Sequence, residues 1–274
     1  MVTQEQRRRQ LAREKFLRQQ QRRTSARRKT RMRNSVIASV LGVVVIVGVT
    51  LYTTGALKGN DDKTNASSET TPSATPSASK APDPCEKPAA GKVAKLSWKK
   101  EPAMTIDTSA KYTMTLSTTC GDIGIALKTS AAPHTVNSFD FLASKGYFDH
   151  TKCHRLTTNG IYVLQCGDPT GTGSGGPGYT IPDENLKDTS LKGGVYPAGT
   201  VAMANTGQKH TGGSQFFLVY QDSQLPASYT PFGTVDAAGL KILKKIAAAG
   251  ENTGQGDGAP NATVVINKAA VTKS

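Results

Sequence analysis

The sequence predicts a mainly β domain, a barrel or sandwich with two helices attached, that follows a membrane span and a polar linker. Short apolar runs bounded by turn residues recur from about residue 105, and only two segments there have helical spacing. An uncharged stretch of 23 residues lies before them. We therefore divide the 274 residues into a basic cytoplasmic tail (1–34), a transmembrane signal-anchor helix (35–57), a disordered linker (58–104) and a globular domain (105–274).

The net charge of +14 is concentrated in the tail. Residues 1–34 carry 13 basic and two acidic residues, whereas the other 240 residues carry 21 basic and 18 acidic ones. Because the globular part is close to neutral, composition argues against a domain that binds nucleic acid. The tail either forms a basic helix on anionic lipid headgroups or serves only as a topology signal.

The membrane span is predicted from length and charge. Ser35–Leu57 holds no charged residue, and a helix that rises about 1.5 Å per residue crosses the roughly 30 Å hydrocarbon core over this length. Basic residues cluster at 27–33, so the N-terminus is expected in the cytoplasm and the domain outside a single-pass cell membrane anchor. A cleaved signal peptide is the alternative, but both its basic and its apolar regions would be unusually long.

The linker is predicted from composition. Residues 58–104 are rich in Ser, Thr, Ala and Pro and lack apolar periodicity, so they cannot build a core of their own. Prolines favour extended backbone, and we expect a loose spacer that holds the domain away from the membrane.

The cysteines indicate disulfides. The chain has four of them, Cys85, Cys120, Cys153 and Cys166. An even number in an extracytoplasmic domain is typical of disulfides, and no closely spaced Cys pair supports a zinc site. If Arg155 and Gln165 share one face of adjacent strands, Cys153 lies on that face and Cys166 on the other. This arrangement disfavours a Cys153–Cys166 bond and favours Cys120 joined to one of the two, but the connectivity of the four cysteines stays open.

The first strands are predicted as a hairpin. Apolar residues alternate over 112–116 and 123–127, on either side of a turn at 119–122. Adjacent Phe216 and Phe217 must face opposite sides of a strand, so one can enter the core while the other lines a groove. Further short apolar runs lie at 161–164, 201–203, 215–220 and 263–266.

Two helices are predicted from spacing and end signals. Residues 132–145 place apolar side chains on one face, with Pro133 near the start and Gly146 after the end. Residues 236–249 repeat the pattern, and Gly250 follows.

The glycine-rich loop at 168–179 contains a formal Gly-x-Gly-x-x-Gly at Gly171, Gly173 and Gly176. That motif binds dinucleotides only when a helix begins within it, and Pro177 prevents one. The chain also has no Gly-x-Ser-x-Gly and no His-Glu-x-x-His, which argues against common hydrolase sites. We expect no metal and no cofactor.

Arg155 is the first candidate for a catalytic residue. After Arg33 the chain contains 20 lysines but only this arginine. Arginine differs from lysine in its planar, permanently charged fork of donors, so its single use indicates a specific role. An ion pair at the edge of the core is the alternative.

Three segments carry a family resemblance. CHRLTTNGIYVLQCGDPTGTGSGGPGY, GTVAMANTGQKHTGGSQFFLVY and LPASYTPFGTV resemble, in this order, the cyclophilin-type peptidyl-prolyl cis/trans isomerases, over about 107–270. The anchor, the linker and two additional residues in the 157–160 loop look like the anchored actinobacterial branch. The resemblance implies an eight-stranded closed antiparallel β-barrel capped by two α-helices, with the site on the outer surface of the barrel.

The resemblance also implies residue roles. Arg155, Gln165 and Asn205 match the catalytic set. Tyr162 replaces the usual Phe, and Tyr229 replaces the usual His. The positions that match substrate-binding residues are Tyr162, Val163, Thr206, Gln215, Phe217, Leu225 and Tyr229.

These roles imply a mechanism without a covalent step. Rotation about an X-Pro bond loses amide resonance, at a barrier of roughly 18–20 kcal/mol. The twisted prolyl nitrogen gains a lone pair to which Arg155 can donate a hydrogen bond, which stabilises the transition state specifically. The expected partners are unfolded or extended proline-containing polypeptides outside the cell membrane, and no nucleic acid. The alternative is a membrane-tethered module or chaperone that binds proline peptides with little turnover.

Overall fold

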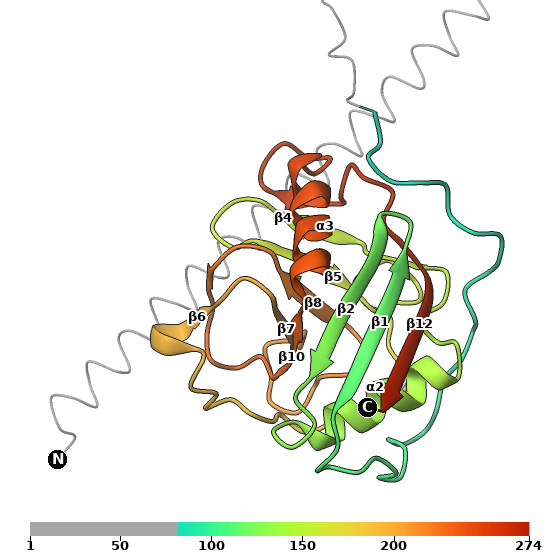
Figure 1. Ribbon diagram of the computed structural model, residues 1–274, viewed down its shortest axis with the longest axis vertical. Helices are drawn as coiled ribbons and strands as arrows, with labels where there is room; N and C mark the ends of the chain where they lie inside the picture. The colour runs from blue at the N-terminus through green and yellow to red at the C-terminus, as the bar shows by residue number, and fades with distance from the viewer. Residues whose placement is uncertain (1–81, 274) are drawn as a thin grey trace, which may run out of the picture. The chain divides into compact units, whose positions relative to one another are not determined.

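The computed structural model describes residues 82–273 (Figure 1). The predicted tail (1–34) and transmembrane helix (35–57) lie outside the described residues, as does the linker up to residue 81. Within 82–273, no helix has the length and apolar character needed to cross a membrane.

Most of the described strands form a single sheet. Its ten strands run in the order β11-β4-β5-β8-β7-β10-β2-β1-β12-β3, and β6 pairs with β9 separately. Every pairing between these strands is antiparallel. The strands are β1 (Tyr112–Thr118), β2 (Gly121–Leu127), β3 (Thr151–Lys152), β4 (Arg155–Thr157), β5 (Val163–Cys166), β6 (Val195–Tyr196), β7 (Thr200–Met203), β8 (Phe216–Val219), β9 (Ser223–Gln224), β10 (Pro231–Val235), β11 (Asp257–Gly258) and β12 (Val265–Lys273).

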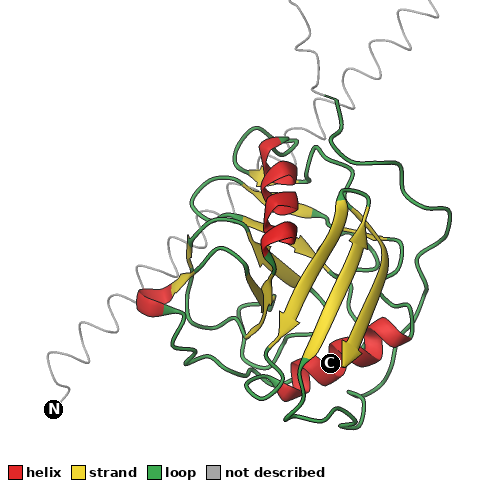
Figure 2. Cartoon of the chain, in the orientation of Figure 1, coloured by secondary structure: helices red, strands yellow, loops and turns green. Residues whose placement is uncertain are grey.

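The sheet curls around a core, which confirms the mainly β class (Figure 2). The two end strands, β3 and β11, have two residues each, and no ladder joins them within the described chain. The chain passes directly from β3 to β4 through Cys153 and His154. A closed barrel of eight strands therefore stays a prediction.

Both predicted helices are present. Helix α2 (Pro133–Ser144) packs against β12, and α3 (Ala237–Ala248) packs against β2 (Figure 1). The Asp236 side chain accepts a hydrogen bond from Gly239 N at 2.6 Å and so caps the start of α3. One short 3-10 turn, η1 (Lys192–Gly194), precedes β6.

The strand predictions are confirmed where apolar and polar residues alternate within a short segment. The hairpin forms as β1 and β2, but β10 was not predicted, because its sequence PFGTV has turn residues. Gly233 is needed there, since a Cβ at this position would lie 2.7 Å from Cγ2 of Ile125 on β2. Pro231 is tolerated as the first residue of its strand.

Residues 83–104, which we name the strap, lie along the domain although the sequence predicts a loose spacer there (blue-green in Figure 1). The Trp98 ring lies 5.0 Å from the Phe141 ring and 6.0 Å from the Tyr147 ring. Asn137 on α2 donates to Ala103 O at 3.0 Å and accepts from Thr105 N at 2.9 Å. The strap carries apolar side chains that the rest of the linker lacks, and these pack against the core.

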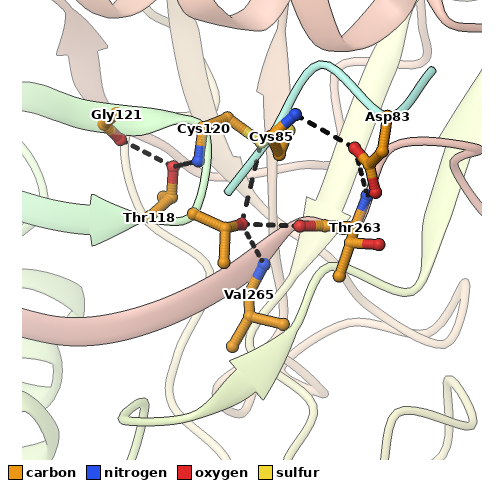
Figure 3. Close-up of a disulfide and its surroundings, with 8 residues drawn as sticks. Asp83, Cys85, Thr118, Cys120, Gly121, Thr263 and Val265 are labelled. Atoms are coloured by element: carbon orange, nitrogen blue, oxygen red, sulfur yellow. Dashed lines mark hydrogen bonds between the residues drawn. A yellow bond between two sulfur atoms is a disulfide. The ribbon is translucent and has the colours of Figure 1, made fainter. Parts of the chain in front are cut away.

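A disulfide fixes the start of the strap. Cys85 is bonded to Cys120, at the turn between β1 and β2 (Figure 3). Asp83 accepts hydrogen bonds from Cys85 N at 3.0 Å and from Thr263 N at 3.0 Å. Thr118 Oγ1 accepts from Cys120 N at 3.1 Å, which orders the turn that carries the cysteine. The strap is thus joined to the hairpin and to the segment before β12.

The second disulfide joins Cys153 to Cys166, the bond that the strand alternation disfavoured, so that argument is wrong. The premise of that argument holds, because Arg155 and Gln165 are cross-strand partners and share one face. The error came from extending strand alternation back to Cys153, which lies outside β4. There Cys153 N donates to Val264 O at 2.9 Å, and its side chain is buried in the core beside Cys166.

Candidate functional site

Four residues form a row across the outer face of the sheet. Arg155 on β4 is opposite Gln165 on β5, Gln165 is opposite Phe217 on β8, and Phe217 is opposite Ala202 on β7. Directly opposed residues of antiparallel strands point to the same face. The register therefore places the arginine, an amide and an aromatic ring on one surface.

Phe216, the residue before Phe217 in the sequence, points to the opposite face of the sheet. Phe216 is fully buried in the main core, with its ring 5.4 Å from that of Phe139 and 6.0 Å from that of Phe148. Phe217 belongs to a separate cluster. The prediction that these two rings occupy opposite faces is confirmed.

This separate cluster, which we name the outer cluster, forms an apolar patch on the same face as Arg155. Its members are the buried Val163, Leu191, Tyr196, Ala202, Phe217 and Val219 and the partly buried Ile161, Ala204, Leu225 and Tyr229. The Phe217 and Tyr229 rings are nearly perpendicular at 5.4 Å, and Tyr196 lies 6.4 Å from each. Leu225 and Tyr229 keep part of their surface exposed, so the cluster can accept a small apolar group.

Tyr162 is placed differently from the other predicted pocket residues. It packs against the main core, with its ring 5.9 Å from that of Tyr220. Its neighbour Val163 belongs to the outer cluster. Consecutive residues of an extended segment face opposite sides, so the structure does not bring Tyr162 into the outer cluster.

Arg155 is held on two sides. Its Nε donates to Asp257 Oδ1 at 2.7 Å, its Nη2 donates to Asp257 Oδ2 at 2.8 Å, and its Nη1 donates to Gln165 Oε1 at 3.2 Å. The hydrogen bonds to Asp257 raise the pKa of Arg155, although burial opposes them. The side chain keeps 37% of its surface exposed, so the guanidinium remains reachable from solvent.

A chain of amides continues from Arg155. Gln165 Nε2 donates to Gln215 Oε1 at 2.9 Å, and Gln215 Nε2 donates to Gly175 O at 2.9 Å. Each amide thus has its oxygen toward the arginine and its nitrogen toward the glycine-rich loop. This order fixes the Gln165 oxygen in the orientation that accepts from Arg155.

Asn205 and Thr206 lie at the end of β7. Asn205 Nδ2 donates to Ser228 O at 2.7 Å and its Oδ1 accepts from Gly207 N at 3.0 Å, so the side chain is occupied locally. Within 82–273 no hydrogen bond engages the backbone N–H or C=O of Asn205. Thr206 Oγ1 donates to Thr211 Oγ1 at 3.0 Å. The backbone of Asn205, rather than its amide, is free to pair with an extended ligand.

A groove of about 1070 Å³ lies beside the row, and we name it the Gly-rich groove. The loop from Gly173 to Thr180 forms one side of it, and the strap contributes Lys99, Lys100 and Glu101. The remaining lining residues include Gln165, Asn205, Thr206 and Gln215. Gln165, Asn205, Thr206 and Gln215 therefore line one groove next to the outer cluster, whereas Arg155 is not among its lining residues.

The loop at 168–179 contains no helix, as its prolines predict. Burial acts to raise the pKa of Asp168, but hydrogen bonds from Thr170, Gly173 and Gly175 lower it to about 2. The charged Asp168 accepts from the backbone N–H of Thr172 at 3.0 Å and of Gly173 at 2.6 Å. Its role is to order the loop. In the part of the chain that the structure describes, no group of three acidic, His or Cys side chains is arranged to hold a metal.

Comparison with known proteins places this site in a family. The family model for cyclophilin type peptidyl-prolyl cis-trans isomerase/CLD matches residues 113–271. The chain belongs to this family. The matched range begins after the strap and contains the whole row from Arg155 to Phe217.

Three curated relatives show how far the likeness extends. A probable peptidyl-prolyl cis-trans isomerase B of Mycobacterium leprae is 49% identical over 70% of this chain and 63% of its own length. Its counterpart in Mycobacterium tuberculosis is 49% identical over 57% of this chain and 53% of its own length. Peptidyl-prolyl cis-trans isomerase B of Bacillus subtilis is 42% identical over 45% of this chain and 82% of its own length. The chain thus spans less than two thirds of the two mycobacterial relatives.

Several residues of the cyclophilin site were not predicted. Tyr196 is fully buried in the outer cluster and donates from its hydroxyl to Tyr229 O at 2.9 Å. Asp257 comes from a glycine-rich segment far along the chain, and Lys99 and Lys100 come from the strap. A half-buried arginine needs an acidic partner, and this was the only signal for Asp257. The sequence alone does not show which of the acidic residues is that partner.

Proposed function

We propose that this cyclophilin domain is a peptidyl-prolyl cis/trans isomerase that accelerates rotation about X-Pro bonds in unfolded or extended polypeptides. The observation that carries the proposal is the row in which Arg155 and Phe217 are both cross-strand neighbours of Gln165. Isomerisation of an X-Pro bond requires an apolar patch for the proline ring and, on the same face, a donor such as a guanidinium for the prolyl nitrogen. The family membership of the chain supports the same activity.

The outer cluster receives the proline ring. Phe217 and Val163 supply the apolar floor, and Leu225 and Tyr229 supply a partly exposed rim. Burial of a pyrrolidine ring there is favourable because it removes apolar surface from water. The unpaired backbone of Asn205 pairs with the peptide beside the proline, and Thr206 and Gln215 line the path of the flanking residues.

Arg155 acts on the prolyl nitrogen. When the C–N bond twists, resonance is lost and the nitrogen becomes a hydrogen-bond acceptor, which it is not in the planar amide. The guanidinium has more N–H groups than its three bonds to Asp257 and Gln165 use. A remaining N–H donates to the pyramidal nitrogen. This bond forms only in the transition state, so it lowers the barrier rather than strengthening substrate binding.

The ion pair with Asp257 is compatible with this role. Asp257 takes the Nε side of the guanidinium, while Nη1 points toward Gln165, the cross-strand neighbour of Phe217. Fixed on both sides, the donor needs little reorganisation during the reaction.

We also propose that the domain acts outside the cytoplasm, on secreted chains, from a membrane anchor formed by residues 35–57. Two disulfides in the described chain support an oxidising compartment. The basic residues before the apolar stretch support a cytoplasmic N-terminus. Clients are then polypeptides that emerge unfolded, with exposed X-Pro bonds.

The test is an isomerase assay on the full-length chain in detergent. The variant is R155A, and the control is K152A, which removes a positive charge from a nearby exposed residue. Two-dimensional NMR exchange on a short X-Pro peptide measures the rate without a coupling protease. We expect R155A to lose roughly 10²-fold in kcat/KM, by analogy with removal of one transition-state donor, with little change in peptide affinity. K152A should match the unmodified chain.

Two outcomes contradict the proposal. If R155A accelerates exchange as well as the unmodified chain, the mechanism is wrong. If the unmodified chain binds the peptide but does not accelerate exchange, the domain is the proline-peptide-binding module that the sequence left open.

A further inference from the structure

We propose that the strap is part of the substrate-binding surface, and that Lys99 and Lys100 select peptides that carry an acidic residue close to the proline. This inference rests on the proposed function, because it assigns a specificity to the same site. It concerns a segment outside the range 113–271 that the family model matches. The subsite is therefore built by this chain's own extension.

The strap is fixed against the glycine-rich loop just before the lysines. Trp98 N donates to Pro177 O at 2.8 Å, and the Trp98 ring packs against Phe141 and Tyr147. The fit at Gly178 is close, since a Cβ there would lie 2.6 Å from Trp98 O and would clash with the Ser97 side chain. The strap therefore forms a fixed wall of the groove.

The strap is fixed again just after the lysines. Glu101 Oε1 lies 3.2 Å from His134 Nδ1 on α2, and Asn137 of the same helix holds the backbone at Ala103. Lys99 and Lys100 thus lie between two anchored points, and both line the groove. Their backbone cannot move away from the groove without breaking one of these contacts.

The two lysines are the unpaired charges of the groove. Within the described chain, neither ammonium forms a hydrogen bond or an ion pair. Glu101 is engaged by His134, and Asp168 behind the loop is engaged by backbone N–H groups. The other polar side chains that line the groove are neutral, among them the amides Gln165 and Gln215.

A carboxylate on the peptide complements this arrangement. Two exposed lysines on one wall attract a single negative side chain that enters beside Gln165. The acidic side chain among the groove's lining residues, Glu101, lies against His134 on α2. Exposed ion pairs are individually weak, so two of them predict a preference of roughly 2- to 10-fold. Because the lysines are exposed, the preference must fall with salt.

The experiment compares matched peptides on the full-length chain in detergent. Each pair carries Glu or Gln at one position, one to three residues before or after the proline, and kcat/KM is measured by NMR exchange at low and high salt. The variant is K99Q/K100Q. The control, K87Q/K92Q, removes the same charge from exposed strap residues that do not line the groove.

We expect a Glu-over-Gln preference of roughly 2- to 10-fold at one or two positions, lost at high salt and lost in K99Q/K100Q, but retained in K87Q/K92Q. Equal rates for Glu and Gln peptides in the unmodified chain, or a preference that survives K99Q/K100Q, overturn the inference. Fluorescence anisotropy of the same peptides measures binding separately. If binding shows the preference while no peptide is isomerised, the proposed activity fails and the acidic subsite stands.

Discussion

Arg155 on β4 and Asp257 on β11 form an ion pair through two parallel hydrogen bonds, at 2.7 and 2.8 Å. The pairing of Asp257 with Thr157 brings the carboxylate alongside the arginine. Glu251, which is buried, accepts from Gly256 N at 2.8 Å and orders the loop that leads to Asp257. The orientation of the proposed catalytic donor therefore depends on a loop 102 residues away in sequence.

The first prediction concerns D257N, which keeps the shape of the side chain and removes its charge. The two-point geometry that fixes the guanidinium weakens, because an amide presents only one acceptor oxygen. We expect kcat to fall about 10-fold, equivalent to ~1.4 kcal/mol, with KM nearly unchanged. NMR exchange measures both parameters.

The control for this prediction is D122N, an exposed aspartate on β2. It should behave as the unmodified chain. If D257N keeps full kcat, Asp257 does not position Arg155. A fall in thermal stability without a change in kcat assigns Asp257 a purely structural role.

The parts of the fold that could be predicted are those with local signals. The hairpin of β1 and β2 alternates apolar and polar residues around a turn, and α2 begins at Pro133 and ends before Gly146. Each pattern is complete within about 15 residues, so it needs no knowledge of distant partners. β10 failed because its Pro and Gly are typical of turns, although its role in the sheet requires a small residue at Gly233.

The site was predictable only in part, for a similar reason. Arg155 was found because it is the single arginine of the domain, and its partner Gln165 lies ten residues away. Asp257 reaches Arg155 only through β11, whose two residues carry no strand signal. The cysteine pairing failed at Cys153, because a break in the strand before β4 is invisible in an alternating pattern.

The second prediction concerns the strap. A chain that begins at residue 105, the boundary expected from composition, loses the Cys85–Cys120 bond and the packing of Trp98. Loss of a native disulfide costs about 2–5 kcal/mol. Trp98 is partly buried, so loss of its packing adds at most the value for full burial of a large apolar side chain, about 1.5–3 kcal/mol. We expect a clearly lower unfolding temperature than for a chain that begins at residue 83.

The double variant C85S/C120S separates the two contributions. It should lose only the disulfide part of the stability and keep Trp98 in place. Trp98 is the only tryptophan, so its fluorescence reports the strap directly. If the two truncated chains unfold at the same temperature, the strap does not stabilise the domain.

The third prediction concerns Y196F. The variant removes the Tyr196 hydroxyl beneath the rim of the outer cluster. This hydroxyl donates to Tyr229 O at 2.9 Å and more weakly to Pro226 O at 3.4 Å, and it accepts from Tyr229 N at 3.3 Å. We expect a loss of about 0.5–1.5 kcal/mol in unfolding free energy and a higher KM, because the rim residue Tyr229 is held less firmly. Urea unfolding and NMR exchange measure the two effects.

Y220F is the matched control, since the Tyr220 hydroxyl donates to Thr157 O at 2.6 Å in the main core. It should lose comparable stability without a change in KM. Equal KM values for Y196F and the unmodified chain contradict a role for the Tyr196 hydroxyl in shaping the pocket.

The last prediction concerns pH. His154 precedes Arg155, and both of its ring nitrogens are buried without a hydrogen-bond partner in the described chain. Burial lowers its pKa below the ordinary value of 6.5, and Arg155 and Lys152 add to this against the opposing effect of Asp168. Below pH 6.5 the unfolded chain therefore binds a proton more readily than the folded one, so His154 makes the protein lose stability as pH falls.

H154F replaces the imidazole with a ring that does not titrate. We expect the urea midpoint of H154F to fall less between pH 7 and pH 5 than that of the unmodified chain. The other three histidines are common to both proteins, so their effects cancel in the comparison. The pKa of Asp168 is lowered from 3.8 to about 2, so its contribution to stability is fully present above pH 3.8 and is lost as pH falls through about 2. This change lies outside the interval from pH 7 to pH 5. Parallel pH dependences for the two proteins mean that the unpartnered imidazole is not what makes this fold sensitive to mild acid.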